Sequence, residues 1–216
     1  VNELLRNDIK VTMLGRINNN EYNQKIRRIN WTLGNNFPDW PGFSDVNWPS
    51  AEAVIHLAHQ WDDQSGANSA NHSSTRILFN SAKKAGIKRF VYASSVSSSV
   101  NAKNNYGQIK WQIEEEMTSD FFIPARIGLV YGGNQSSQWG LLCKLVRFTP
   151  ILPMFNPKQM VQPIHISEVA MGLTKLALTS KLYQQKYILA APNTIMFASF
   201  MLVSLSIIRF IVCCAI

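Results

Sequence analysis

The sequence predicts an α/β protein built on a doubly wound parallel sheet. Short apolar runs alternate with amphipathic helical segments through most of the chain, which is the order of βαβ units. One run, residues 53–58 (AVIHLA), is apolar without interruption. Such a run is typical of a strand that helices cover on both faces of the sheet. We therefore expect a sheet whose carboxyl edge holds the ligands and the chemistry.

The composition fits a globular chain and limits the classes of function. The 216 residues are 46% hydrophobic and 16% charged, which is enough apolar material for one sizeable core. The net charge of +8 permits an anionic partner. The basic residues are scattered, however, and no basic run contains interleaved aromatic residues, so no nucleic-acid partner is expected.

The cysteine and histidine patterns predict neither a disulfide framework nor a metal site. The three cysteines show no CxxC motif and no Cys/His ligand spacing, and the four histidines include no HExxH. His56 and His59 are three residues apart but at the end of an expected strand, so we interpret them as structural or cofactor-lining side chains. A reducing, cytoplasmic compartment is the expected location.

The first half of the chain is expected to contain four strands. Residues 1–7 are expected to be the end of a helix, and residues 9–14 a strand. A polar stretch with a short helix is expected at residues 18–28 and another strand at 29–33. After a loop rich in Asn, Pro, Gly and Trp at residues 34–50, the expected elements are a strand, a helix and a strand at residues 53–58, 71–85 and 90–93. Gly86 is the expected end of that helix.

The second half continues the alternation. A helix, a strand and a helix are expected at residues 106–117, 123–130 and 141–148. A loop, a short β segment, a helix and a last strand are expected at residues 153–162, 164–166, 167–178 and 187–189. Ser167 is the expected N-cap of the helix at 167–178, with Glu168 in its first turn near the positive end of the helix dipole.

A serine, a tyrosine and a lysine follow the expected strand at residues 90–93 and predict a proton-transfer site. Ser95 lies just past the strand end, and Tyr106 and Lys110 share one face of a helix because they are four residues apart. A free tyrosine has a pKa of about 10. A nearby ammonium lowers that pKa, so Tyr106 could exchange a proton with a substrate hydroxyl. The pattern favours hydride transfer over acyl transfer, because no base partner for the serine is evident.

Five segments of the chain occur in an order typical of one enzyme family. They are AVIHLAH (53–59), NHSSTRILFNSAKKAGIKRFVYASS (71–95), YGQIK (106–110), PARIGLVYGG (124–133) and VQPIHISEVAMGL (161–173). Together they resemble extended or atypical short-chain dehydrogenase/reductases of the NAD(P)-dependent epimerase/dehydratase type, over roughly residues 1 to 195. Ser74 departs from the pattern, since glycine is usual there. The resemblance implies a Rossmann-type sheet with a short C-terminal substrate lobe.

The resemblance also implies a role for each site residue. Tyr106 would be the catalytic acid/base, Lys110 its pKa-lowering and ribose-binding partner, and Ser95 the hydroxyl that polarises the substrate, with Ser94 as its rival. The expected cofactor-binding residues are Arg16, Leu57, Ala58, His59, Asn71, Tyr106, Lys110, Ile127 and Gly128. Arg16, where an acidic residue would bind the ribose of NAD, favours NADP over NAD, although a solvated surface arginine is the alternative.

Both ends of the sequence depart from the family pattern. The first strand and its GxxGxxG turn are absent, so we expect either an incomplete record of a longer protein or a degraded relative. The predicted domains are an NAD(P)-binding Rossmann domain at residues 1–150, a partial substrate lobe at 151–195 and an apolar tail at 196–216. That tail is apolar apart from Arg209 and small hydroxyls, which predicts either a membrane segment or an altered end of the lobe.

The predicted function is that of an NAD(P)-dependent oxidoreductase or nucleotide-sugar epimerase/dehydratase. Its Ser-Tyr-Lys site would serve hydride transfer at a secondary alcohol or ketone, and a nucleotide sugar is the expected substrate. Two alternatives are a non-catalytic, cofactor-binding regulatory relative or inactive fragment, and a membrane-attached fragment held by residues 196–216. The sequence leaves open whether the protein forms a homodimer.

Overall fold

The computed structural model describes residues 1–15, 26–30, 51–61, 69–133 and 158–203. The chain divides into two compact units, which are described in turn. The first consists of Val1–Arg126 with Ala170–Tyr187, and the second of Ile127–Val169 with Ile188–Ile216.

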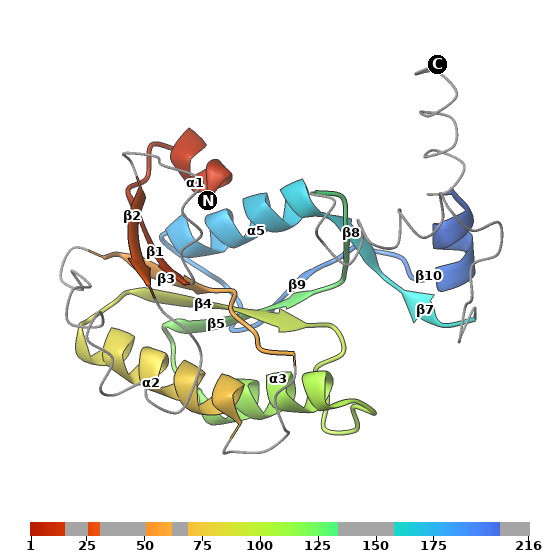
Figure 1. Ribbon diagram of the computed structural model, residues 1–216, viewed down its shortest axis with the longest axis horizontal. Helices are drawn as coiled ribbons and strands as arrows, with labels where there is room; N and C mark the ends of the chain where they lie inside the picture. The colour runs from red at the N-terminus through yellow and green to blue at the C-terminus, as the bar shows by residue number, and fades with distance from the viewer. Residues whose placement is uncertain (16–25, 31–50, 62–68, 134–157, 204–216) are drawn as a thin grey trace. The chain divides into compact units, whose positions relative to one another are not determined.

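A parallel sheet organises the first unit (Figure 1). Its strand order is β3-β4-β5-β9, and the strands are β3 (Ala53–His56), β4 (Arg89–Ser95), β5 (Phe122–Ile127) and β9 (Tyr187–Leu189). β3 and β4 run parallel, with His56 opposite Tyr92. A separate parallel pair is formed by β1 (Val11–Gly15) and β2 (Ile26–Asn30). The predicted α/β class with a parallel sheet is therefore confirmed.

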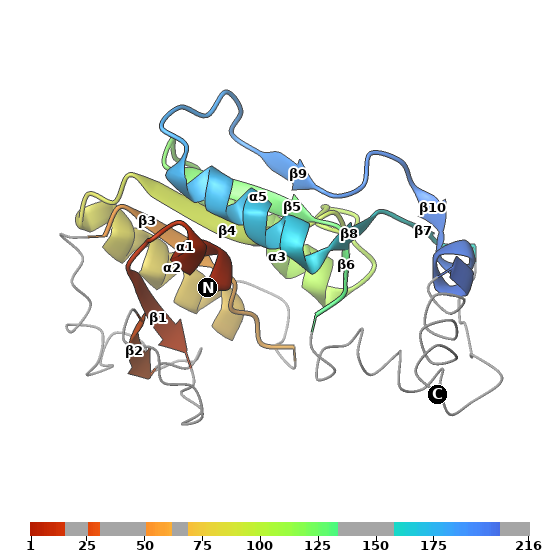
Figure 2. The same ribbon diagram turned by 90° about the horizontal axis from the view of Figure 1, so that it is seen from above.

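Helices cover both faces of this sheet. α2 (Ala70–Lys84) and α3 (Asn105–Glu116) lie side by side on one face, as Figures 1 and 2 show. α5 (Ile166–Leu178), which belongs to this unit from Ala170 onward, lies on the other face. A short helix, α1 (Asn2–Arg6), precedes β1. This layering is what makes the strands apolar on both sides.

Local sequence signals explain where α2 begins and ends. The Ser69 hydroxyl accepts a hydrogen bond from the backbone N–H of His72 at 3.0 Å, which caps the first turn. Gly86, with φ of +73°, lies directly after the C-cap residue, as a glycine at a helix end commonly does. Leu78, Phe79 and Ala82 are buried on one face of the helix. The predicted helix at residues 71–85 is confirmed.

Aromatic rings fill the core between α2 and the sheet. The ring of Phe79 lies 5.9 Å from that of Phe90, 5.1 Å from that of Phe121 and 5.6 Å from that of Phe122, measured between centroids. Leu78, Ile87, Ile109 and Ile113 are buried in the same cluster. The core therefore ties α2 and α3 to the middle strands of the sheet.

The second unit contains two small sheets. β6 (Leu129–Tyr131) pairs in parallel with β8 (Pro163–His165), and β7 (Met160–Val161) pairs antiparallel with β10 (Ile195–Met196). Phe200 and Met201 are buried against a group of partly buried residues, namely Leu129, Tyr131, Val161, Ile195 and Phe197. The first residues of the apolar tail thus pack in a protein core. Within the described part of the chain, none of the helices combines the length and the apolar character that a membrane span requires.

Several predicted boundaries are wrong for identifiable reasons. The expected strand at 123–130 is two strands, because the chain changes partner: the N–H of Gly128 still donates to Leu189 of β9 at 2.9 Å, whereas the N–H of Leu129 donates to the carbonyl of Gln162 at 2.8 Å. The strand expected from residue 29 begins at Ile26, within a stretch read as polar. Ser167 does not cap α5, since its hydroxyl bonds Nδ1 of His165 at 2.6 Å. Glu168 binds the backbone N–H of His165 instead, at 3.0 Å.

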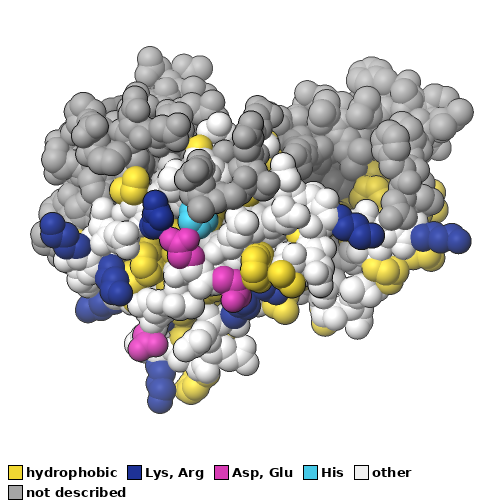
Figure 3. All heavy atoms as spheres, turned by 90° about the horizontal axis from the view of Figure 1, so that it is seen from below, with side chains coloured by type: hydrophobic (Ala, Val, Ile, Leu, Met, Phe, Trp, Pro, Cys, Tyr) yellow, Lys and Arg dark blue, Asp and Glu magenta, His cyan; other side chains and the backbone are white. Residues whose placement is uncertain are grey.

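The charged side chains are dispersed on the face that Figure 3 shows. Lys and Arg side chains appear there at separate places, with acidic side chains between some of them. The net charge of the whole chain is +8, but on the part of this face that the structure describes the basic side chains do not form one patch.

Candidate functional site

The candidate site lies in the first unit, where β4 ends and α3 begins. Asn104 caps α3, since its side-chain oxygen accepts from the backbone N–H of Gly107 at 2.8 Å. A Cβ atom on Gly107 would lie 2.6 Å from the carbonyl oxygen of Ser97, so only glycine lets the helix approach the serine loop this closely. This contact brings the first turn of α3, and Tyr106 in it, next to the loop that follows β4.

Ser95 is the last residue of β4 and is buried. Its Oγ lies 2.9 Å from Oγ of Ser97 and accepts from the backbone N–H of Ser97 at 3.2 Å. The Ser95 side chain also acts on Tyr106, because it lowers the pKa of the phenol. The structure therefore places both predicted site residues where β4 ends and α3 begins.

Lys110 lies one turn further along α3 and is only 2% exposed. Its Nζ donates to the carbonyl oxygen of Ala93 at 2.6 Å. The same ammonium lies 4.5 Å from the ring centroid of Tyr92 and 5.6 Å from that of Tyr106. Lys110 and Tyr106 thus lie close together on α3, and Ser95 ends the strand β4 that α3 contacts.

The electrostatics differ from the expectation that Lys110 lowers the pKa of Tyr106. Burial raises the pKa of Tyr106 above its usual value of 10.0, and the hydrogen bond from Ser95 opposes this only in part. Burial also lowers the pKa of Lys110 to about 7, although the charge of Glu114 opposes that change. At neutral pH the phenol is therefore protonated, and burial weakens the preference of Lys110 for its charged form.

Two aromatic side chains surround Tyr106 from the segment after β3. The His59 ring packs edge-on against the Tyr106 ring, with centroids 4.8 Å apart. The Trp61 ring stacks on the Tyr106 ring at 5.1 Å, with planes 19° apart, while Trp61 itself is 63% exposed. Trp61 was not among the predicted site residues. Its place directly after AVIHLAHQ, at the end of a buried strand, was the signal that could have identified it.

Asn71 and His56 hold this segment in place. Asn71 exchanges two hydrogen bonds with the backbone of Gln60, both at 2.8 Å. The Nε2 of His56 lies 2.9 Å from the Thr75 hydroxyl, which itself donates to the carbonyl of Asn71 at 2.6 Å. The hydroxyl therefore accepts from His56. In this structure Asn71, a predicted cofactor-binding residue, serves to fix the loop that carries His59 and Trp61.

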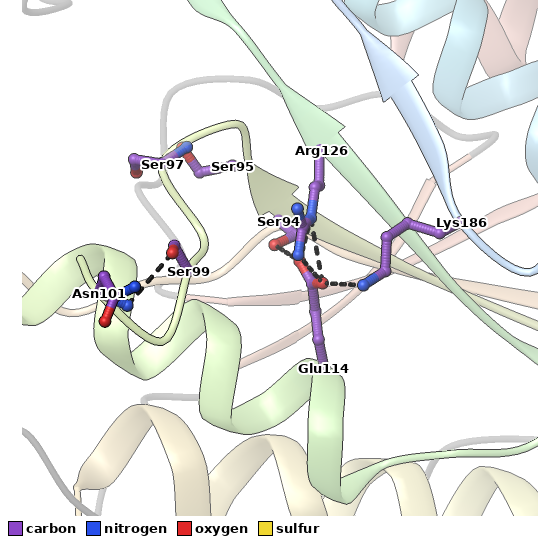
Figure 4. Close-up of polar contacts among 8 residues, drawn as sticks. All are labelled: Ser94, Ser95, Ser97, Ser99, Asn101, Glu114, Arg126 and Lys186. Carbon is purple, nitrogen blue, oxygen red and sulfur yellow. Dashed lines mark hydrogen bonds and ion pairs between the residues drawn. The ribbon is translucent and has the colours of Figure 1, made fainter.

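A buried carboxylate next to the site was missed by the sequence analysis. Glu114 lies on α3 one turn beyond Lys110, and its side chain contacts Ser94, Arg126 and Lys186 (Figure 4). Residues 114–116 form an acidic run that resembles a solvated face. The available signal was that Glu114 is four residues from Lys110, which places both on one helix face. In the structure Ile113 and Glu114 are buried, while Glu115 is exposed.

The remaining predicted cofactor residues have varied positions. Arg16 lies outside the described residues. Leu57 is exposed and Ala58 is partly buried, both just after β3. Ile127 and Gly128 belong to the second unit, where a Cβ on Gly128 would lie 2.1 Å from the carbonyl oxygen of Gln162. Glycine is thus required at 128 by packing within that unit.

Comparison with known proteins rests on structure alone. The sequence matches no protein-family model and no curated protein. Among solved structures, MoeE5 in complex with UDP-glucuronic acid and NAD aligns with a TM-score of 0.67 and 18% identity, over 92% of this chain and 74% of MoeE5. WbmG from Bordetella bronchiseptica in complex with NAD and UDP aligns with a TM-score of 0.72 and 12% identity, over 96% of this chain and 73% of WbmG.

A third similar structure has an activity in its name. TunA, an NAD-dependent NDP-hexosamine 5,6-dehydratase, aligns with a TM-score of 0.71 and 15% identity, over 95% of this chain and 75% of TunA. These neighbours are consistent with the resemblance to NAD(P)-dependent epimerases and dehydratases. At such identities the likeness concerns the fold. The chain therefore has the Rossmann-type α/β fold of these NAD-bound and NAD-dependent proteins.

Proposed function

We propose that this chain is an NAD(P)-dependent enzyme that transfers hydride at a secondary alcohol or ketone of a nucleotide sugar. One observation carries the proposal. At the carboxyl end of β4, the Lys110 ammonium lies 5.6 Å from the centroid of the Tyr106 ring, and the Ser95 side chain lowers the pKa of Tyr106. The carboxyl ends of the strands are where open α/β sheets hold their ligands.

Tyr106 is the proposed proton donor and acceptor. Because burial raises its pKa, the phenol is protonated at neutral pH and can donate its proton to a developing alkoxide on the substrate. In the opposite direction it takes the hydroxyl proton as the C–H bond breaks. A charged Lys110 nearby favours the phenolate that this direction requires.

Ser95 is the proposed hydroxyl that orients the substrate oxygen. Its rival Ser94 is committed elsewhere, because the Ser94 hydroxyl donates to Oε1 of Glu114. Ser95 instead lowers the pKa of Tyr106, so it acts on the group that is proposed to move the proton. This difference supports Ser95 for the role.

Lys110 fits the ribose of a nicotinamide cofactor in one respect. The ammonium has three N–H donors, and its bond to the carbonyl of Ala93 uses one of them. The others can serve the ribose hydroxyls. When bound, the cofactor supplies the hydride acceptor or donor. Leu57, Ala58, His59 and Asn71 are proposed to lie along it, on the resemblance alone.

The proposed cofactor preference is for NADP. Arg16 directly follows β1, and no acidic residue stands there to bind the ribose hydroxyls of NAD. The proposed substrate is a nucleotide sugar, since MoeE5 was solved with UDP-glucuronic acid and with UDP-glucose. A net charge of +8 suits such an anionic ligand.

Replacing Tyr106 by Phe tests the proposal. We expect turnover of nucleotide sugars to fall by about 10²–10⁴-fold, because general acid–base catalysis contributes that much. Titrations followed by reduced-cofactor fluorescence should show binding unchanged by Tyr106→Phe and tighter for NADPH than for NADH. Tyr183→Phe is the matched control, because Tyr183 is 85% exposed and lies outside the site.

Two results would contradict this proposal. Turnover by Tyr106→Phe equal to that of the unmodified chain would remove Tyr106 from the chemistry. Tight binding of a reduced cofactor without turnover of any nucleotide sugar would instead identify a binding protein. Tighter binding of NADH than of NADPH would overturn the cofactor preference alone.

A further inference from the structure

Glu114 is a buried carboxylate that the roles assigned above leave unused. Its side chain is 0% exposed although it belongs to the acidic run at residues 114–116. Burying a carboxylate is costly unless hydrogen bonds and opposite charges compensate for the lost water. The groups that compensate Glu114 come from three parts of the first unit, and Figure 4 shows how they converge.

Three donors bind the two carboxylate oxygens. Arg126, on β5, donates from Nε to both oxygens at 3.1 Å and from Nη2 to Oε2 at 2.7 Å. Lys186, just before β9, lies with Nζ 2.8 Å from Oε2. The Ser94 hydroxyl, on β4, donates to Oε1. Glu114 therefore links α3 to β4, to β5 and to the segment before β9.

Hydrogen bonds within the segment around Lys186 fix its conformation. The hydroxyl of Tyr187 accepts hydrogen bonds from the backbone N–H groups of Tyr183 and Gln184, both at 3.1 Å. These bonds hold residues 183–187 in a tight turn. Lys186 is 41% exposed, so it reaches the buried carboxylate from the surface.

The cluster keeps Glu114 ionised. Burial alone would raise the pKa of this carboxyl, but hydrogen bonds from Arg126, Lys186 and Ser94 outweigh it and leave the pKa below its usual value. The negative charge is thus present at neutral pH. It lies on the same face of α3 as Lys110, because the two residues are four positions apart.

We propose that Glu114 is a positioning residue for the Ser95–Tyr106–Lys110 site. Through Ser94 it fixes the residue next to Ser95, and through its charge it favours the ammonium form of Lys110. The inference rests on the proposed function for its meaning in catalysis, but not for its test. The charge on Lys110 matters because it favours the Tyr106 phenolate.

Lys110 is the group whose titration reports on this arrangement. The titratable and charged groups around it come from every neighbouring element of the first unit. They are His56 and His59 from β3 and the segment after it, Tyr92 from β4, Tyr106 and Glu114 from α3, and Arg126 and Lys186 behind Glu114.

Glu114→Gln removes the charge and keeps the shape of the side chain. We expect the midpoint of the Lys110 titration, followed by NMR of isotopically labelled lysine, to fall by about one pH unit, because an opposite charge nearby favours the charged form. The Lys110 signal is assigned by its absence in Lys110→Met. Glu115→Gln is the matched control, since Glu115 is the exposed neighbour on the same helix.

Lys186→Met provides a second variant with the opposite expected sign. Removing this cation leaves Glu114 less neutralised, so the midpoint of Lys110 should rise. Arg126 and Ser94 still bind the carboxylate in this variant, so it provides a test that does not depend on the folding of Glu114→Gln. Lys181→Met is its control, because Lys181 lies over the Tyr183 ring on the same segment, away from Glu114.

A merely structural Glu114 predicts a different result. In that case Glu114→Gln lowers the melting temperature but leaves the Lys110 midpoint where it is in the unmodified chain, and the proposal is overturned. Equal shifts in Glu115→Gln or Lys181→Met would overturn it as well. Because this measurement needs no substrate, it can succeed while Tyr106→Phe disproves the proposed function, and the reverse.

Discussion

The two ends of β4 are built from opposite kinds of contact. At its amino end, Phe90 is fully buried among the rings of Phe79, Phe121 and Phe122. At its carboxyl end, the Ser94 hydroxyl donates to Glu114 of α3, and the Ser95 hydroxyl lies 2.9 Å from that of Ser97. One strand of seven residues thus anchors the core at one end and carries the site at the other.

The difference shows where stability and chemistry are placed. Burial of aromatic area is favourable and needs no directional partner. The polar end requires a specific partner for each group, and Lys110 is held there with a pKa lowered by burial to about 7. We therefore expect substitutions at the amino end to change folding and substitutions at the carboxyl end to change chemistry.

The largest expected effect on stability is at the amino end. Phe90→Ala should lower the free energy of unfolding by about 3–5 kcal/mol, because it leaves a cavity among the packed rings. Urea unfolding measures this change. Val96→Ala is the control, since Val96 is exposed just beyond the carboxyl end of β4 and should cost little. Equal losses in the two variants would break the comparison.

The parts of the fold that follow from local patterns were predictable. The apolar runs that became β3 and β4 and the periodic segment that became α2 were identified because burial on both faces and helical spacing leave clear signals. The break between β5 and β6 was not, since it is set by a change of partner from β9 to the segment around Gln162, to which the N–H of Leu129 donates. The segment 123–130 alone carries no mark of that contact.

In the candidate site, too, only the contacts that follow from local spacing were predictable. Tyr106 and Lys110 share a helix, so their proximity follows from spacing. Trp61 and Lys186 reach the site region from other segments, and nothing in their local sequence specifies their partners. The expectation that Lys110 lowers the pKa of Tyr106 missed the degree of burial, which raises the pKa of Tyr106 and lowers that of Lys110.

A smaller effect on stability is expected at His56 of β3, which is paired with Tyr92 in the middle of β4. The rings of these paired residues stack with centroids 5.8 Å apart. Burial, with smaller effects of the charges on Lys110 and His59, lowers the pKa of His56 from 6.5 to about 3. The unfolded chain therefore binds a proton that the folded chain does not, and stability should fall as the pH drops from 6.5 towards 3.

The expected loss from His56 is about 2 kcal/mol at pH 5, relative to pH above 6.5. Comparing the unfolding free energy of the unmodified chain with that of His56→Gln isolates it, because other titrating groups contribute to both. The difference between the two should change between pH 6.5 and 5 and stay constant above pH 6.5. A difference that is constant over the whole range would show that burial of His56 does not govern the slope.

The smallest expected effect concerns the stacking of Trp61 on Tyr106. Offset aromatic pairs contribute about 0.5–1.5 kcal/mol beyond the area they bury. A double-mutant cycle of Trp61→Ala and Tyr106→Leu, measured by urea unfolding, should give a coupling energy in this range. The same cycle of Trp61→Ala with Tyr183→Leu should be additive.

The coupling energy between Trp61 and Tyr106 shows whether the candidate site at the carboxyl end of β4 also contributes to stability. Trp61 is 63% exposed, so little of its area is buried, and the mutation removes its ring contacts with Tyr106 and His59. Coupling within the expected range would mean that Trp61 helps to hold Tyr106. Additive losses would leave the His59 contact, with ring centroids 4.8 Å apart, as what orients Tyr106.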